Sequence, residues 1–304
     1  MSAESQRPAD NAASRSARTA HPLALTAALA ALRCPLCATP LTQASQSLRC
    51  EHGHSFDISR QGYVSLDVGS RRAGTADTPP MVAAREQFLR QGHFAPIARA
   101  LSSVASRFGP AADDAGIVLD LAGGTGYYLA AVLGSGLARS GICMDLSKPA
   151  LRRAARIHPR AAAVRRDVWQ PFPLADGSAS TVMSVFGPRN ARETLRVLSP
   201  SGVFLLVTPT ARHLGEVTEE LGMISVDAAK AERLAASMSG FDLLTAETMT
   251  YRVALGHHDL SNLVAMGPSA HHVTATQLAR RVAALPEPRP VTICVSIAAY
   301  RPQP

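Results

Sequence analysis

Two clusters of metal-binding side chains lie near the start of the chain, at Cys34-Pro-Leu-Cys37 and Cys50-Glu-His-Gly-His54. Two cysteines separated by two residues can hold one metal ion from a tight turn, and a second pair of ligands can complete a tetrahedron. Three thiolates and one imidazole make a closed, structural zinc site, because no position remains open for substrate. The fourth ligand is His54 or His52, and the three residues between Cys50 and His54 favour His54. The alternative is a set of free, buried thiols.

Cysteine usage also indicates the compartment. The chain has five cysteines, and three of them lie between residues 34 and 50. Few, clustered cysteines in a long chain indicate metal binding in a reducing compartment rather than a disulfide framework, so we expect a cytoplasmic protein. The segment around them is too small to bury a core alone, and a bound metal ion would stabilise it.

A glycine-rich turn follows an apolar run in Ile117-Val-Leu-Asp-Leu-Ala-Gly-Gly-Thr-Gly126. Such a turn lets the backbone approach a ligand closely, and Gly126 opens a helix toward it. A dinucleotide site would read Gly-x-Gly-x-x-Gly, whereas this segment reads Asp120-x-Ala122-x-Gly124-x-Gly126. A carboxylate at the strand end would repel a pyrophosphate, but it suits a cationic sulfonium ligand that carries an ammonium group. The pattern therefore predicts an S-adenosylmethionine site.

Two further acids stand where this cofactor needs acceptors. Asp145 ends the next predicted strand, where a carboxylate can accept both ribose hydroxyls. Asp167 follows the third strand, in Asp167-Val-Trp-Gln-Pro-Phe172, where it can accept a hydrogen bond from the adenine amino group. Each acid alone could equally be a helix cap or a surface residue. The order of Asp120, the glycines, Asp145 and Asp167 supports the joint interpretation.

Alternating elements would position these residues. Apolar runs that read as buried strands alternate with helical segments, which predicts an α/β fold with a Rossmann-like class I methyltransferase sheet and a small N-terminal zinc-binding domain. Two late segments, Thr248–Ala254 and Thr292–Tyr300, have alternating strand character with no long apolar helix between them, and they fit an antiparallel end of that sheet. The runs read as strands are Ile117–Leu121, Gly141–Met144, Thr181–Phe186 and Val203–Thr208. Helices are predicted near Met81–Arg90, Phe94–Phe108, Tyr128–Leu137, Pro149–Ile157, Arg212–Leu221 and Ala228–Met238.

The predicted domain organisation has four parts. Residues 1–31 form an extension without order and a short lead-in helix, residues 32–70 the zinc-binding domain, residues 71–84 a linker and residues 85–304 the methyltransferase domain. No stretch is long and apolar enough to span a membrane. The Ala/Leu-rich run Pro22–Leu32 imitates a secretory leader, but Arg33-Cys34 follows it without a small-residue cleavage site.

The charge balance suits a polyanionic partner. Lys and Arg number 31 against 23 Asp and Glu, which gives a net charge of +8, and Lys148 and Lys230 are the only lysines. Arginine holds phosphates through two donors and stacks on bases. A GC-rich genome would produce the same excess of Arg and Ala, so net charge is a supporting argument for nucleic acid.

Several short motifs together resemble one known family, the RlmA-type 23S rRNA guanine-N1 methyltransferases. The resemblance spans about Leu32 to the C-terminus and is most similar to the actinobacterial branch that confers resistance to macrolides such as tylosin and mycinamicin. Besides the cysteine clusters, the motifs are His54-Ser-Phe-Asp57, Gln61-Gly-Tyr-Val64, Gln91-Gly-His-Phe94, Met144-Asp-Leu-Ser-Lys-Pro149, Val185-Phe-Gly-Pro-Arg-Asn190 and Val264-Ala-Met-Gly-Pro-Ser269.

The resemblance implies N1-methylation of a guanine in a 23S rRNA hairpin loop, of the guanine-748 type, by a homodimer. It implies His54 rather than His52 as the fourth zinc ligand, beside Cys34, Cys37 and Cys50. It also implies S-adenosylmethionine contacts at Phe94, Gly124, Thr125 and His213. Phe94 departs from the tyrosine of part of the family, and Ala122 replaces the usual first glycine.

Guanine N1 is mostly protonated at neutral pH, so the reaction needs a base or a group that stabilises charge on O6. We expect Asn190 to read the guanine edge and Arg189 to hold O6 or a phosphate, although this loop could also merely cap a helix. The target base would have to be splayed from its hairpin. We expect Arg60, Arg71 and Arg72 to contact the RNA backbone. A second group on one helix, Arg152, Arg153 and Arg156, could extend this surface or could simply form a solvated helix face.

Two other functions fit parts of the sequence. A small-molecule methyltransferase of an antibiotic pathway would share the cofactor half but has no need of a zinc domain or a basic balance. A zinc-dependent RNA-binding protein with a decayed methyltransferase fold would not need Asp120, Gly124, Gly126 and Asp145 intact.

Overall fold

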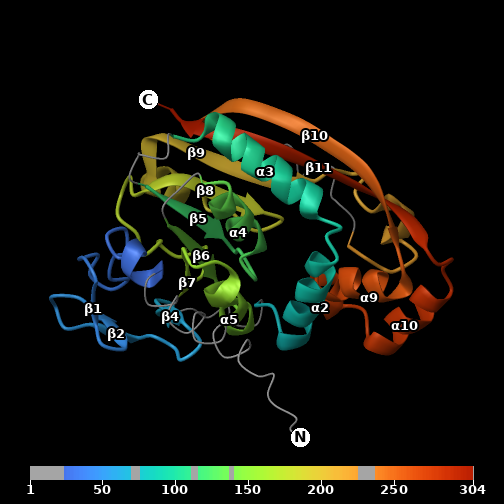
Figure 1. The fold of residues 1–304 in the computed structure, drawn as a ribbon, viewed down its shortest axis with the longest axis horizontal. Helices are drawn as coiled ribbons and strands as arrows, with labels where there is room; N and C mark the ends of the chain where they lie inside the picture. Colours follow the sequence, from blue (N-terminus) through green and yellow to red (C-terminus); the bar gives the residue numbers. More distant parts are fainter. Residues whose placement is uncertain (1–23, 70–75, 111–115, 137–139, 225–236, 304) are drawn as a thin grey trace, which may run out of the picture.

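The computed structural model describes residues 24–69, 76–110, 116–136, 140–224 and 237–303. Arg71 and Arg72, residues 1–23 of the predicted extension and most of the helix predicted near Ala228–Met238 lie outside these ranges. The rest of the chain builds one large sheet with helices on its faces and a small three-stranded sheet near the N-terminus beside it (Figure 1).

Within the described residues, eight strands form one sheet in the order β10-β11-β9-β8-β5-β6-β7-β4. The strands from β9 to β4 are parallel, and β11 pairs antiparallel with both β9 and β10. This order confirms the predicted Rossmann-like methyltransferase sheet with an antiparallel end. The bounds are β4 Tyr63–Ser65, β5 Ile117–Leu121, β6 Gly141–Asp145, β7 Ala161–Arg165, β8 Ala179–Val185, β9 Leu198–Pro209, β10 Phe241–Leu255 and β11 Arg289–Pro302.

The chain order reverses at β5, which has β6 on one side and β8 on the other. In open parallel sheets, ligands bind at the carboxyl ends of the strands at such a switch point. The glycine turn that follows β5 therefore lies where a cofactor is expected.

Both faces of the sheet are buried, which explains why its central strands are continuous apolar runs. Side chains such as Val118 and Leu205 pack on one face with the helices α3, α4 and α5. Their neighbours Leu119 and Leu206 pack on the other face, which α6 and the N-terminal segment cover. The helices are α2 Pro79–Arg90, α3 Ala95–Phe108, α4 Tyr127–Gly134, α5 Lys148–Ile157 and α6 Ala191–Val197.

The N-terminal segment shares a core with the sheet. Its strands are β1 Thr42–Ala44, β2 Ser47–Arg49 and β3 Ser55–Asp57. Leu25 in helical residues 24–28, Leu32, and Leu48 in β2 belong to the same cluster as Leu119. Leu32 also forms a β-bridge with Leu174. The segment thus packs as part of the sheet layer.

The predicted domain boundaries stay predictions. The strand β4, inside the expected zinc-binding domain, pairs in parallel with β7 and extends the main sheet. The helix α2 begins at Pro79, within the expected linker, because proline is favoured in the first helical turn.

Three helices lie between β10 and β11 in the chain. They are α9 His257–Ala265, the 3-10 turn η2 Pro268–His271 and α10 Ala275–Ala283, and α9 packs against α2. Two of them, α9 and α10, lie beside α2 at the lower right of Figure 1. The helix predicted near Arg212–Leu221 is shorter, since α7 spans Gly215–Thr218. None of the helices in the described part of the chain is long and apolar enough to cross a membrane.

Candidate cofactor site and metal centre

The metal centre brings together Cys34, Cys37, Cys50 and His54, whose ligand atoms all lie within 4.8 Å of one another. His54 Nδ1 is 3.5 Å from the Sγ atoms of Cys34 and Cys37 and 3.4 Å from that of Cys50. The Sγ atoms of Cys37 and Cys50 are 3.7 Å apart, close to the edge of about 3.8 Å that Zn–S bonds of about 2.3 Å give in a tetrahedron. The donor set and its spacing fit a structural zinc ion.

Hydrogen bonds from Thr39 favour the thiolate form of Cys37, which is the form that a zinc ligand needs. The Thr39 hydroxyl, 3.2 Å from Cys37 Sγ, and the Thr39 backbone N–H lower the pKa of Cys37 to about 5. His52 is exposed and lies outside the four-ligand cluster. The geometry therefore selects His54 over His52.

The glycine turn is shaped by Asp120 beneath it. Asp120 is 1% exposed at the end of β5, and its Oδ2 has no hydrogen-bond partner among the described residues. Burial, and then the nearby carboxylate of Asp145, raise the pKa of Asp120 well above its usual range. A Cβ at Gly123 would lie 2.5 Å from Asp120 Oδ2, so only glycine fits there. A buried carboxylate without a partner is suited to a cationic ligand, which would stabilise its charged form.

Asp145 is held in place by two backbone donors at the end of β6. Its Oδ2 accepts a 2.9 Å hydrogen bond from the Gly124 N–H, and its Oδ1 accepts a 2.7 Å bond from the Ser147 N–H. Gly124 has a φ of +57° and Gly126 a φ of +78°, so the turn uses the left-handed region at both glycines. The carboxylate is thus fixed at the carboxyl edge of the sheet.

Asp167 offers a free acceptor on the neighbouring loop. Its Oδ1 accepts a 2.9 Å hydrogen bond from the Trp169 N–H, whereas its buried Oδ2 has no partner in the described chain. Trp169 is 52% exposed and lies beside it.

Two adjoining cavities occupy this edge of the sheet. The first, of about 220 Å³, is lined by Phe94, Asp120, Thr125 and His213, and the second, of about 300 Å³, by Asp145 and Asp167. Both cavities are also lined by Arg85, Phe186 and Pro268. Gly124 and Gly126 shape the turn and do not line either cavity.

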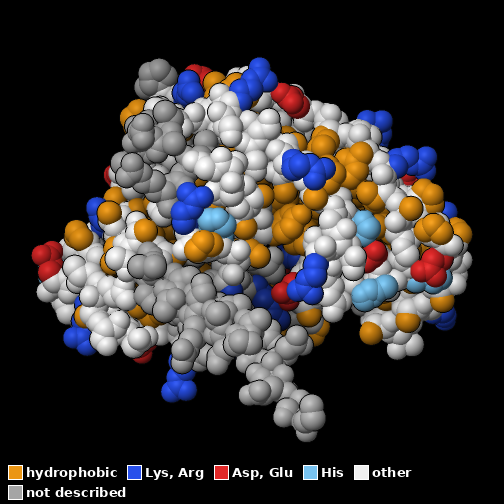
Figure 2. Space-filling model, in the orientation of Figure 1, with side chains coloured by type: hydrophobic (Ala, Val, Ile, Leu, Met, Phe, Trp, Pro, Cys, Tyr) orange, Lys and Arg blue, Asp and Glu red, His pale blue; other side chains and the backbone are white. Residues whose placement is uncertain are grey.

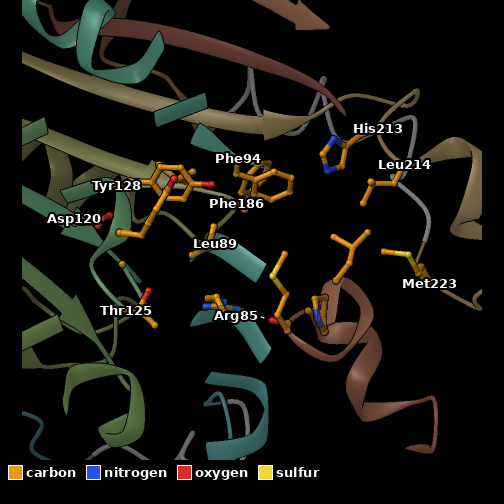
Figure 3. A pocket seen from close by; sticks show the side chains of 17 residues that line it. Arg85, Leu89, Phe94, Asp120, Thr125, Tyr128, Phe186, His213, Leu214 and Met223 are labelled. Carbon is orange, nitrogen blue, oxygen red and sulfur yellow. Dashed lines mark hydrogen bonds between the residues drawn. The ribbon is translucent and has the colours of Figure 1, made fainter. Parts of the chain in front are cut away.

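The first cavity is largely apolar and aromatic (Figure 3). The Phe186 ring stacks on the His213 ring with centroids 5.8 Å apart, and Phe94 lies 5.8 Å from Phe186. Burial lowers the pKa of His213 to about 4, so its imidazole is neutral near pH 7. Figure 2 shows hydrophobic side chains gathered over the region between α3 and the pair α2 and α9.

Unusual backbone conformations cluster here. Ala122, Phe186 and Leu214 have φ values of 51°, 57° and 59°, and all three line the cavities. The other non-glycine residues with positive φ in the described chain are Ala38, beside the metal ligands, and Ser45, in a hairpin. Left-handed backbone at non-glycine residues is costly and marks functional sites.

Arg189 and Asn190 do not line either cavity, and their catalytic roles stay predictions. Asn190 caps α6, since its Oδ1 accepts from the Glu193 N–H at 3.2 Å, and its Nδ2 donates to the Val168 carbonyl at 3.2 Å. Burial lowers the pKa of Arg189, and its Nε has no hydrogen-bond partner among the described residues. The alternative expectation, that this loop caps a helix, is observed at α6.

The expected RNA-binding arginines are only partly free. Arg60, Arg152 and Arg156 are exposed, whereas Arg153 is paired with Glu86 through a 2.8 Å contact from its Nε. On the face shown in Figure 2, Lys and Arg side chains are scattered rather than gathered in one patch.

Sequence patterns missed Arg85 and Phe186, which line both cavities. Arg85 lies on α2, and the spacing of the apolar residues in this helix does not indicate which side chains line the cavities. Phe186 was visible only as the end of a predicted strand, and its left-handed conformation has no sequence signal comparable to glycine.

Comparisons with known proteins agree with this geometry. Residues 32–67 match the zinc-ribbon family model described as RlmA, N-terminal. A relative from Micromonospora griseorubida, provisionally named a 23S rRNA (guanine-N1)-methyltransferase, is 47% identical over 287 residues, which cover 89% of this chain and 97% of the relative. The Streptomyces fradiae 23S rRNA (guanine(748)-N1)-methyltransferase is 45% identical, covering 90% of this chain and 97% of that protein.

A solved structure from Bacillus halodurans, provisionally named a methyltransferase, is 17% identical, covers 68% of this chain and 99% of that one, and has a TM-score of 0.48. The fold assignment rests on the strand order instead. Identity above 40% across about nine-tenths of the chain, together with the RlmA zinc-ribbon match at residues 32–67, shows that the chain belongs to the family of 23S rRNA (guanine-N1)-methyltransferases.

Proposed function

We propose that this chain is an S-adenosylmethionine-dependent enzyme that methylates N1 of a guanine in a 23S rRNA hairpin loop, of the guanine-748 type. The observation that carries the proposal is the 45% identity, across nine-tenths of this chain, to a relative named for that reaction. We also propose that the modification confers resistance to macrolides of the tylosin and mycinamicin kind, and that the enzyme acts in the cytoplasm.

The two cavities support a division of the cofactor. Asp145 would accept the ribose hydroxyls in the second cavity, where the free Oδ2 of Asp167 would accept from the adenine amino group. Asp120, on the first cavity, would face the positively charged methionine end. The bound cofactor supplies the electrophilic methyl group. Phe94, Thr125, Gly124, Gly126 and His213 complete the proposed cofactor-binding set.

The target guanine would enter the first cavity beside the methionine end. Phe94 and Phe186 offer aromatic faces to a splayed purine, and the apolar lining excludes water from the reacting atoms. Tyr128 lines this cavity, and its buried Oη has no partner among the described residues, so it would be available to hydrogen-bond the base edge. The chain thus contributes position and solvent exclusion rather than covalent chemistry.

The zinc centre has a structural role in this proposal, because Cys34, Cys37, Cys50 and His54 would hold the ion and leave no position open for substrate. The exposed Arg60 lies just after it and would contact the RNA backbone. Assembly as a homodimer is proposed on the family resemblance, and light scattering of the purified protein tests it.

The alternative of a small-molecule methyltransferase shares the cofactor site. Transfer of tritiated methyl from S-adenosylmethionine to unmodified 23S rRNA transcript, followed by primer extension, separates the two. N1 methylation blocks Watson–Crick pairing, so we expect one strong stop at a hairpin-loop guanine. Cofactor binding without incorporation into transcript or into ribosomal subunits would contradict the RNA substrate and favour the small-molecule function.

A further inference from the structure

Arg85, on α2, ties together two segments that are far apart in the sequence. Its Nη1 lies 2.7 Å from Asp77 Oδ2, just before α2, and its Nη2 donates a 2.7 Å hydrogen bond to the Met266 carbonyl at the end of α9. Figure 3 shows the guanidinium on the floor of the first cavity with the bond to this carbonyl. Both contacts fix the guanidinium plane while leaving other N–H donors of the group available.

The guanidinium lies over the glycine turn, where the two cavities meet. Arg85 lines both cavities, and a Cβ built on Gly124 would lie only 2.8 Å from its Nη1. A ligand that reaches from Asp145 in the second cavity to Asp120 in the first must therefore pass directly beside Arg85.

Arg85 differs from the other arginine at the cavities in its hydrogen-bond partners. Among the described residues that line the cavities, the arginines are Arg85 and Arg166. Arg166 is 4% exposed and donates to the carbonyls of Leu66 and Pro171, so its donors are directed away from a ligand. Arg85 is thus the permanent cation that the first cavity offers.

We propose that Arg85 binds the α-carboxylate of the methionine part of the cofactor, with Asp77 and the Met266 carbonyl as positioning groups. This inference rests on the S-adenosylmethionine site of the proposed function. With adenosine held at Asp145 and Asp167, the amino-acid part crosses the glycine turn, its ammonium toward Asp120 and its carboxylate toward Arg85. A planar guanidinium suits a carboxylate through two parallel hydrogen bonds.

A ligand pair that differs in this carboxylate tests the assignment. S-adenosylhomocysteine carries the whole amino-acid part, whereas 5′-methylthioadenosine keeps the adenosine and thioether and lacks it. Calorimetry measures the affinity of both ligands for the wild-type chain, for Arg85→Met and for Arg90→Met. Arg90 is the matched control, because it lies on the same helix, pairs with Glu86 and does not line either cavity.

We expect Arg85→Met to weaken S-adenosylhomocysteine binding roughly 10- to 100-fold and to leave methylthioadenosine binding within about threefold, with Arg90→Met unchanged for both ligands. Equal losses for the two ligands would show that Arg85 only ties α2 to α9, and no loss for either would show that it does not bind the carboxylate. Both results overturn the inference.

If Arg85→Met lowers the melting temperature strongly, Arg85→Lys replaces it. Lysine keeps the charge but loses the planar fork, so we expect a smaller loss that is still confined to S-adenosylhomocysteine. If the wild-type chain binds neither ligand, the proposed S-adenosylmethionine site itself is wrong. This outcome is distinct from a failure of the Arg85 assignment, in which the wild-type chain binds the ligands normally.

Discussion

The backbone N–H of Cys294, in β11, donates a 3.2 Å hydrogen bond to Nδ1 of His213. Because Nδ1 accepts, the neutral ring carries its proton on Nε2, the nitrogen left to donate to a ligand. The antiparallel end of the sheet thereby sets the tautomer of a residue that lines the first cavity.

Burial of His213 predicts a pH-dependent stability. The pKa of His213 falls from 6.5 to about 4 in the folded chain, so the unfolded chain binds more protons between these values. Stability therefore decreases as pH falls from about 6.5 toward 4, by at most about 3 kcal/mol from this residue. In His213→Asn, whose Oδ1 can still accept from Cys294, the free energy of unfolding measured in urea should depend less on pH in this range. The exposed His271→Asn is the control, and an unchanged pH slope in His213→Asn would contradict the assignment.

Zinc should be stoichiometric and should stabilise the whole chain, because the ribbon shares its core with the sheet through residues such as Leu32 and Leu48. We expect elemental mass spectrometry to find one zinc ion per wild-type chain and to find that His54→Ala has lost the zinc. His52→Ala should keep the metal, since His52 lies outside the four-ligand cluster. Chelation should lower the melting temperature of the entire protein in one transition. A separate, earlier transition of the ribbon alone would show that the shared core contributes little.

Local sequence signals sufficed to predict the cluster of four metal ligands and the glycine turn after β5, since cysteine spacing and glycines report on short segments. The cavity walls were harder to predict, because they come from elements that meet only in the folded chain. Arg85 reaches Met266 across 181 positions, and no periodicity encodes that contact. Asn190 shows a different difficulty: a polar side chain after a strand end suggests catalysis and helix capping equally, and the structure shows that its Oδ1 caps α6 while its catalytic role stays a prediction.

Ala122 tests whether backbone strain at the turn matters for stability. It has a φ of 51°, a conformation that costs an L-residue about 1 kcal/mol or more. We expect Ala122→Gly to raise the free energy of unfolding by up to about 1 kcal/mol. Ala131→Gly, in the interior of α4, should instead lower it by a similar amount. A loss of stability in Ala122→Gly would mean that the methyl group packs usefully beside Gly187.

Asp167 should decide which purine the second cavity accepts. Its Oδ1 is held by the Trp169 N–H, so its Oδ2 is left to accept from an adenine amino group. In Asp167→Asn, Oδ1 can keep the Trp169 bond while the new amide donor faces the ligand. We expect S-adenosylhomocysteine to bind roughly 10- to 100-fold more weakly and S-inosylhomocysteine, whose 6-oxo group accepts, to bind more tightly than to wild type. Asp242→Asn, on β10 and away from both cavities, is the control. A parallel change for the two ligands in Asp167→Asn would place the base elsewhere, because only a direct contact at position 6 reverses the preference.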